Sequence, residues 1–220
     1  MPMKLYGHPF SSYTQKALMA LYENDTPFEF MMLSPEHPDI YADFAQRWPI
    51  QRFPIIVEGD RQVMEATCVI EYLDTHQPGA VRFIPQDPDA AIEVRMLDRF
   101  FDNYVHAQLQ RIVGDSLRKD PADRDPYGVD EARARLDTAY AWLDQHMADR
   151  EWAAADAFTL ADCAAAPALF YADWTHRIGA QFRNVQAYRQ RLLARPSFAR
   201  CVEGGRPYRH LFPLGAPDRD

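Results

Sequence analysis

The chain contains 220 residues, of which 47% are hydrophobic, and its 24 basic and 32 acidic side chains give a formal net charge of −8. This acidic balance argues against nucleic acid or an anionic membrane as the main partner, because both attract basic surfaces. No apolar run approaches the roughly 18 residues of a membrane span, and the N-terminus lacks the charged-then-apolar order of a secretory signal, so we expect a cytoplasmic protein.

The first half of the chain mixes strand and helix signals. In chain order these predict a strand at 3–7, a helix at 14–23, a strand at 28–33, a short amphipathic segment at 41–48, an apolar strand at 54–57, a turn at 58–60, a strand ending at 64 and a helix from 66. A helix between two strands implies a parallel pair, and the final hairpin adds antiparallel partners. We therefore predict an α/β domain of order βαβαββα around a mixed four-stranded sheet.

A change of composition marks a domain boundary. Residues 79–90 are rich in proline, glycine and charge, and every periodic stretch after them is helical. We expect a first domain at residues 1–78, a linker at 79–90 and an all-helical domain at 91–220.

The second half shows helical apolar spacing throughout. Its features are, in order, apolar stripes at 97–109 and 136–147 with a loop at 119–128 between them, an amphipathic helix at 185–194 and an irregular tail at 204–220. Thr159 and Asp162 match a variant capping box, in which the threonine caps the helix and the acid answers it. Pro196 should end the amphipathic helix.

Three loops of the first half place polar groups where a helix or strand begins. Ser11 and Ser12 precede a helix, whose free amides favour an anion. Pro54 enters an apolar strand, and a cis bond after Phe53 would turn the preceding carbonyl and amide outward. Glu65 offers a carboxylate beside free amides at the next helix start. Together these groups predict a site for a zwitterionic ligand.

Four segments carry a resemblance to one family. They are LYGHPFSSYTQKALMAL, WPIQRFPIIVEGD, MEATCVIEYLD and FTLADCAAAPAL. These resemble, in turn, the catalytic loop, the cis-proline segment, the glutamate-serine helix start and the second-domain folding box of the cytosolic glutathione transferases, of a serine-using, theta-, zeta- or bacterial-like type. The resemblance covers nearly the whole chain. It implies a thioredoxin-like domain that holds glutathione, a helical domain that completes an apolar co-substrate pocket, and a homodimer.

The resemblance also implies a catalytic hydroxyl. Ser11 falls where serine-using members place the group that donates to the glutathione sulfur. A free thiol with a pKa of about 8.5 is little ionised at neutral pH, so such a donor favours the nucleophilic thiolate. Ser12 is the first alternative, because the bacterial cysteine-using class places its cysteine one residue later. Tyr6 is the second, since its position resembles that of the tyrosine donor in other classes.

Five residues match the family's glutathione-binding positions. Phe53, held by Pro54, would pair its backbone with the cysteinyl part of glutathione. Arg52 lies where a cation approaches the glycyl carboxylate, and Glu65 where a carboxylate meets the γ-glutamyl ammonium. Ala66 departs from the family, which usually has a serine or threonine there. The lost hydroxyl is worth roughly 1.5 to 3 kcal/mol if it bonds a carboxylate.

Further residues concern the missing hydroxyl and the co-substrate pocket. Thr67 would replace the lost hydroxyl only if the turn were rebuilt. The co-substrate pocket is expected to use some of a set of aromatic and histidine side chains, namely Phe10, Phe101, Tyr104, His106, Tyr171 and Trp174. The three cysteines are odd in number and far apart, which favours reduced thiols, and no metal-ligand spacing is present.

The resulting functional prediction is a glutathione transferase that conjugates glutathione to a small hydrophobic electrophile, with glutathione as co-substrate and no metal. Retained Ser11, Pro54 and Glu65 favour this activity. Ala66 favours the alternative, a non-catalytic binding or stress-adaptor protein on the same fold. A glutathione-dependent isomerase or reductase ranks lower, because the loop cysteine that reduction usually needs is missing.

Overall fold

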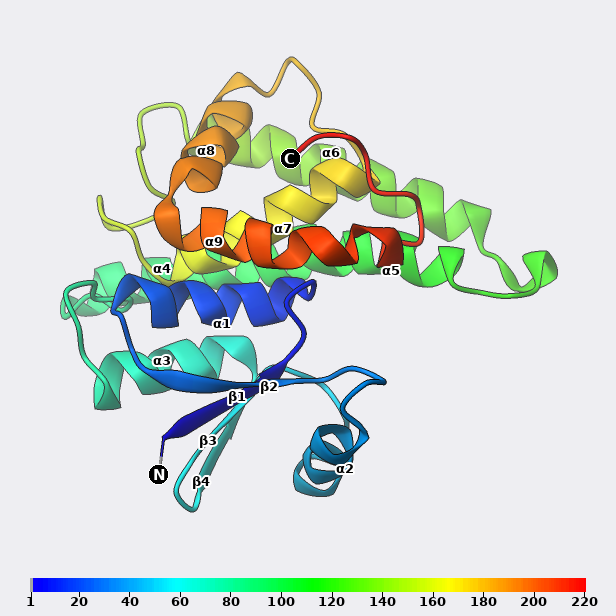
Figure 1. The fold of residues 1–220 in the computed structure, drawn as a ribbon. Coiled ribbons are helices and arrows are strands. Elements are labelled where there is room, and N and C mark those ends of the chain that lie inside the picture. Colours follow the sequence, from blue (N-terminus) through cyan, green and yellow to red (C-terminus); the bar gives the residue numbers. More distant parts are fainter. Residues whose placement is uncertain (1) are drawn as a thin grey trace.

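The computed structural model describes residues 2–220, with an α/β half followed by a helical half (Figure 1). The first half contains, in chain order, β1 (Met3–Gly7), α1 (Ser12–Glu23), β2 (Phe28–Met32), α2 (Pro38–Arg47), β3 (Ile55–Glu58), β4 (Arg61–Met64) and α3 (Ala66–His76). The strands lie in the order β2-β1-β3-β4, with β1 parallel to β2 and antiparallel to β3, and with β3 antiparallel to β4. The predicted mixed four-stranded sheet is confirmed.

Helices cover both faces of this sheet. α1 and α3 lie between the sheet and the helical half, and α2 lies on the other side (Figure 1). Leu5 and Ile56 are opposite one another in the register and belong to the core that includes α1 and α3. Tyr6 and Ile55, the next opposed pair, pack instead with Phe44 of α2. Successive strand residues point to opposite faces, so both faces of the central strands are buried.

The second half is helical. It contains α4 (Pro88–Phe100), the π-helical segment η1 (Phe101–His106), α5 (Ala107–Ser116), the 3₁₀ turn η2 (Pro121–Asp123), α6 (Pro126–His146), α7 (Leu160–Thr175), α8 (Arg183–Ala194), α9 (Pro196–Gly205) and the 3₁₀ segment η3 (Arg206–Leu211). α7 is the centre of this half, because its residues from 160 to 174 are all buried. Across residues 2–220, no helix has both the length and the apolar character needed to span a membrane.

The predicted capping box at the start of α7 is confirmed. The Thr159 side chain accepts from the backbone of the first turn, while the Asp162 carboxylate accepts from the Thr159 amide at 2.8 Å. Asp162 is completely buried and also accepts from the Ala153 amide at 2.9 Å and from the Tyr188 hydroxyl at 2.6 Å. One carboxylate thus ties the preceding loop, the helix start and α8 together.

The apolar stripe predicted at 97–109 is interrupted by a π-helical turn. In η1, the amide of Ala107 bonds to the carbonyl of Asp102, five residues earlier. Such single π-helical turns widen a helix by one residue and are frequent at functional sites. This turn brings Asp102 and Asn103 to the wall of the cavity described below.

Several predicted boundaries differ from the structure. α2 begins at Pro38 rather than at 41, and α4 begins at Pro88, inside the predicted linker. α1 begins at Ser12 rather than at 14, because the Ser11 hydroxyl accepts from the Thr14 amide at 3.3 Å and caps the helix. The irregular tail predicted at 204–220 is wrong for 204–211, since α9 reaches Gly205 and η3 continues to Leu211, and is confirmed for 212–220. Pro196 ends α8 but also begins α9, where proline at the first position of a helix costs no hydrogen bond.

Candidate active site

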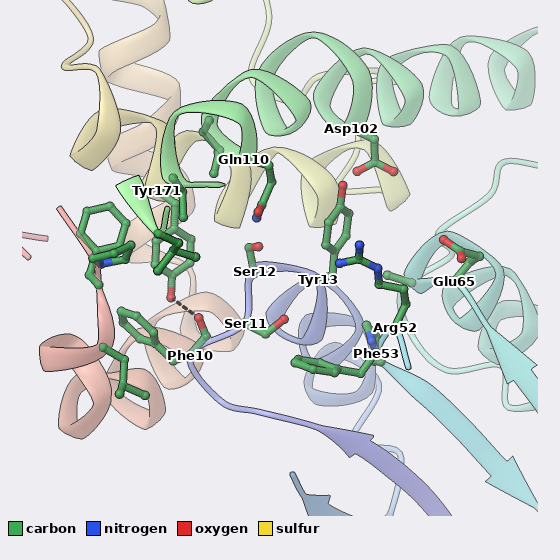
Figure 2. A pocket seen from close by; sticks show the side chains of 18 of the residues that line it. Phe10, Ser11, Ser12, Tyr13, Arg52, Phe53, Glu65, Asp102, Gln110 and Tyr171 are labelled. Carbon is green, nitrogen blue, oxygen red and sulfur yellow. Dashed lines mark hydrogen bonds between the residues drawn. The ribbon is translucent and has the colours of Figure 1, made fainter. Parts of the chain in front are cut away.

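A cavity of about 860 Å³ lies where the start of α1 meets the η1–α5 helix. The first domain contributes Phe10, Ser11, Ser12, Tyr13, Arg52, Phe53, Pro54, Glu65 and Ala66, and the helical half contributes Arg99, Asp102, Asn103, Gln110, Tyr171 and Phe212, among others. Figure 2 shows Ser11, Phe53 and Glu65 along one side of this hollow, with Asp102 and Gln110 on the helix opposite. The three loops selected from the sequence therefore meet at one site.

Ser11 has a hydroxyl that is available to a ligand. It is half-buried, lines the cavity and caps α1 by accepting from the Thr14 amide. Within the described part of the chain, its own proton donates to no acceptor. A group bound in the cavity could therefore receive this hydrogen bond next to the positive end of α1.

Ser12 is differently placed, because its hydroxyl is already paired. Its Oγ lies 2.8 Å from Nε2 of His106, and both residues are buried. The Tyr13 ring stacks on the imidazole with 4.2 Å between ring centroids. Burial lowers the pKa of His106 to about 3, and the charge of Lys16 acts in the same direction. Ser12 is thus bonded to a neutral imidazole at neutral pH.

This buried histidine predicts an acid-dependent loss of stability. Between pH 6.5 and 3, the unfolded chain binds a proton at His106 that the folded chain does not, so stability falls as pH falls through this window. The limiting slope for one proton is about 1.4 kcal/mol per pH unit. Urea unfolding at pH 6.5 and pH 5 should show the wild type losing about 2 kcal/mol more than His106→Gln. Equal losses in the two proteins would contradict the assignment, since all other titrating groups are shared.

Tyr6 lies outside the cavity. Its ring is completely buried against α2, and its hydroxyl donates to the Asp43 carboxylate at 2.5 Å. Burial and the Asp43 carboxylate raise the pKa of Tyr6. The structure thus brings Ser11 and Ser12 together with Glu65 but places Tyr6 on the other face of the sheet.

The Phe53-Pro54 junction and Glu65 lie on the same side of the cavity as Ser11. The Phe53-Pro54 peptide bond is cis, and both residues line the cavity together with Arg52. Glu65 has φ 66°, a left-handed conformation that costs a non-glycine residue of order 1 kcal/mol or more and is frequent at functional sites. Its exposed carboxylate makes no hydrogen bond to the α3 amides. It is therefore available to a cationic group of a ligand.

Thr67 cannot replace the hydroxyl missing at Ala66. Its hydroxyl donates to Asp98 at 3.0 Å and accepts from Lys16 at 3.0 Å and from Arg99 at 2.6 Å. Ala66 itself is buried at the cavity wall. The first turn of α3 thus offers no free side-chain hydroxyl to a ligand.

Sequence reasoning missed a buried ion cluster behind this wall. The Lys16 ammonium lies 2.6 Å from an Asp98 carboxylate oxygen and 3.0 Å from one of Asp102. The signal was present in the sequence, because a lysine interrupts the apolar face of the first helix and two aspartates four residues apart interrupt the stripe from 97. Burial raises the pKa of Asp102, and the Lys16 charge opposes this.

The expected co-substrate residues are divided by the structure. Phe10 and Tyr171 line the cavity, and the Tyr171 hydroxyl donates to the Phe10 carbonyl at 2.9 Å (Figure 2). Four others do not line it, namely Phe101 and His106, which are buried behind the wall, Trp174, which packs behind Phe10, and Tyr104, which is exposed.

The tail supplies cavity residues that the sequence analysis did not name. Leu211, Phe212 and Pro213 line the cavity, and the Phe212 ring packs against Trp174 with 5.3 Å between centroids. The expectation of an irregular tail gave no reason to bring these residues to the site.

Comparisons with known proteins agree with this geometry. Residues 5–80 match the family model described as glutathione S-transferase, N-terminal domain, and residues 97–196 match glutathione S-transferase, C-terminal domain. Among curated proteins, glutathione S-transferase GstB of Escherichia coli K12 is 26% identical over 206 residues, covering 90% of this chain and 96% of that protein. A stringent starvation protein A homolog of Haemophilus ducreyi is 24% identical over 214 residues, covering 95% and 93%. A solved glutathione S-transferase of Methylobacterium radiotolerans, in complex with glutathione sulfonate, has 25% identity and a TM-score of 0.79, covering 92% and 95%.

Proposed function

Because this chain belongs to the glutathione S-transferase family, we propose that it binds glutathione in the cavity and conjugates its thiol to a small hydrophobic electrophile. The observation that carries the proposal is the Ser11 hydroxyl, which donates to no acceptor among residues 2–220 and lines the same cavity as Glu65 and the Phe53-Pro54 junction. The related Escherichia coli and Methylobacterium radiotolerans proteins are glutathione transferases by name, and the latter binds glutathione sulfonate.

Each part of glutathione has a complementary group in this proposal. The Phe53 backbone pairs with the cysteinyl residue, the Arg52 guanidinium binds the glycyl carboxylate, and the Glu65 carboxylate binds the γ-glutamyl ammonium. Arg52 and Glu65 both line the cavity. The sulfur then lies at Ser11, whose hydrogen bond stabilises the thiolate and lowers the pKa of the bound thiol.

The electrophile occupies the apolar side of the cavity. Phe10, Tyr171 and Phe212 lie on the helical side of the Ser11 loop and pack on one another at this wall. An apolar electrophile held there would be oriented towards the thiolate and shielded from water, which raises the rate of a bimolecular attack. In the reaction the sulfur forms a bond to the electrophilic carbon, and the leaving group departs with the electron pair.

Glutathione titration tests the proposal directly. Saturable binding followed by the ultraviolet absorbance of the thiolate, with a thiol pKa below the free value of about 8.5, would support it. Chlorodinitrobenzene conjugation then measures turnover. Binding without a lowered thiol pKa or turnover would instead support the non-catalytic adaptor, which the absent hydroxyl at Ala66 and the similarity to a stringent starvation protein A homolog favour. No saturable binding at millimolar glutathione would overturn both.

We further propose that the protein works in the cytoplasm. Cys68, Cys163 and Cys201 are all free thiols. The cytosol keeps thiols reduced and maintains a glutathione pool that would supply the co-substrate. Cell fractionation with an antibody to the chain tests this placement.

We also propose a homodimer that uses the exposed face of α4. Apolar residues recur on this face every four positions and continue onto η1: they are Ile92, Met96, Phe100 and Tyr104. Ile92, Met96 and Tyr104 are 64%, 53% and 59% exposed, respectively. Trp142 of α6 packs on Phe100 in a tilted arrangement with 4.5 Å between ring centroids, which extends the patch. A continuous apolar patch of this kind is typical of an interaction surface.

A charge placed in this patch should weaken the dimer. We expect Met96→Glu to raise the dimer dissociation constant at least about tenfold, because a carboxylate would be buried without a partner. Sedimentation velocity over a range of concentrations measures this change. Tyr127→Glu is the matched control, since Tyr127 is 79% exposed at the start of α6 and lies outside the patch. If both variants sediment like the wild type, α4 is not the interface.

A further inference from the structure

Arg99 lies in the last turn of α4, on the wall of the cavity. Its side chain is 54% exposed, and its Nη2 donates to the Thr67 hydroxyl at 2.6 Å. Thr67 follows Ala66 directly in the first turn of α3, and both Ala66 and Glu65 line the same cavity. The guanidinium is therefore held against the first turn of α3, the turn that carries Ala66, and it lines the same cavity.

Part of this guanidinium is free to bind a ligand. Arginine carries five N–H donors in a planar fork. Nε and Nη2 donate to an Asp98 carboxylate oxygen at 3.0 and 2.6 Å, and Nη2 also donates to Thr67. Nη1 donates to no acceptor anywhere in residues 2–220. Two N–H groups on a half-exposed edge of the cavity thus have no protein partner.

The charges around Arg99 fit a zwitterion better than a simple anion. Lys16 and Arg99 together balance the two carboxylates of Asp98 and Asp102, so the cluster has no net charge. Glu65 adds a carboxylate to the lining of the same cavity. An amino-acid head group brings an ammonium for Glu65 and a carboxylate for the guanidinium. Because these two charges cancel, its binding leaves the net charge of the site unchanged.

We propose that Arg99 binds the α-carboxylate of the γ-glutamyl residue of glutathione, in place of the hydroxyl that is absent at Ala66. This inference rests on the proposed function. Glutathione has two carboxylates and one ammonium, and the cavity wall offers two arginines, Arg52 and Arg99, and one exposed glutamate. Arg99 thus determines specificity for the γ-glutamyl end, while Arg52 serves the glycyl end.

The test compares glutathione with an analogue that lacks only this carboxylate, 4-aminobutyryl-cysteinyl-glycine. Calorimetric titration of Arg99→Gln should show glutathione binding weakened roughly 10- to 100-fold, as expected for the loss of a charge-assisted hydrogen bond. The analogue should bind both proteins with dissociation constants within about twofold of each other, because it has nothing to offer the guanidinium. Arg95→Gln is the matched control. Arg95 lies one turn earlier on α4, pairs with Glu71 of α3 and does not line the cavity.

Two further variants separate ligand binding from support of the fold. Ala66→Ser in the Arg99→Gln background should recover glutathione affinity about fivefold or more, while leaving the analogue unchanged. Arg99→Lys keeps a cation beside Asp98 and loses the planar fork, so it should be intermediate and covers the case in which Arg99→Gln does not fold.

The possible failures are distinguishable. If Arg99→Gln weakens glutathione and the analogue equally, Arg99 acts only through Thr67 and Asp98, and the inference is wrong although the proposed function stands. The same holds if Arg99→Gln binds glutathione as well as the wild type does. If the wild type itself binds neither ligand, the proposed function fails and takes this inference with it.

Discussion

Replacing Ser11 with alanine should lower kcat/KM for conjugation of glutathione to chlorodinitrobenzene by about 100-fold at pH 7, the usual scale for removing one donor to a developing or bound anion. Ser11 has the hydroxyl that faces the cavity without an acceptor of its own. Without it, the pKa of the bound thiol returns towards about 8.5, and less thiolate is present at neutral pH. Glutathione affinity should change little, since the other contacts remain.

The pH profile gives this prediction its sign. The thiolate forms above the thiol pKa, so the deficit of Ser11→Ala should be largest near neutral pH and shrink as pH rises beyond about 9, where even an unassisted thiol ionises. Ser12→Ala should cost less, because the Ser12 hydroxyl is paired with His106. Thr138→Ala, which removes an exposed hydroxyl on α6, should leave the rate unchanged. A large loss in Ser12→Ala with none in Ser11→Ala would move the catalytic role to Ser12.

Among the substitutions considered for stability, Asp162→Ala should produce the largest loss, about 4 kcal/mol in the free energy of unfolding. The Asp162 carboxylate accepts from the amides of Ala153 and Thr159 and from the hydroxyls of Thr159 and Tyr188. Alanine leaves these buried donors without an acceptor at the start of the central helix. Urea unfolding at pH 7 measures the change as a shift in the midpoint at constant slope.

Two further variants provide a scale for the loss of stability expected in Asp162→Ala. Tyr188→Phe removes one of the hydrogen bonds to Asp162 and should cost about 1 kcal/mol. Asp130→Ala removes an exposed partner of Arg133 and should change the free energy of unfolding by no more than about 0.5 kcal/mol. A loss for Asp162→Ala no larger than that of Asp130→Ala would show that the capping network does not stabilise α7.

Features set by local sequence could be predicted, and features set by distant packing could not. The strands, the helices up to α3 and the Thr159–Asp162 capping box follow from spacing and end signals that lie within a few residues of one another. The Ser11, Phe53 and Glu65 loops could be selected for the same reason, since each lies at the start of a helix or strand. Their meeting in one cavity depends on the strand order β2-β1-β3-β4, which the βαβαββα pattern did not specify.

The other wall of the site depends on contacts between elements far apart in the chain. Arg99 meets Thr67, the neighbour of Ala66, only because α4 packs near the start of α3. Phe212 reaches the cavity only because η3 returns the chain to α7. Lys16 meets its aspartates across more than 80 residues. The interrupted apolar stripes mark Lys16 and the two aspartates in the sequence, but they do not say which residues these side chains meet. In the same way, aromatic spacing selected Phe101, Tyr104 and Trp174 as well as Tyr171.

The π-helical turn η1 has a consequence for the division of labour along this helix. One extra residue in a turn offsets the helical phase by about 100°. The π-helical turn therefore shifts which side chains of α5 face the cavity, relative to the side chains of α4 that pack on α7. An insertion or deletion within 101–106 would rotate α5 relative to α4 about the helix axis, whereas a substitution that keeps the π-helical turn would not. The segment thus lets one continuous helix pack on α7 through α4 and line the cavity through α5.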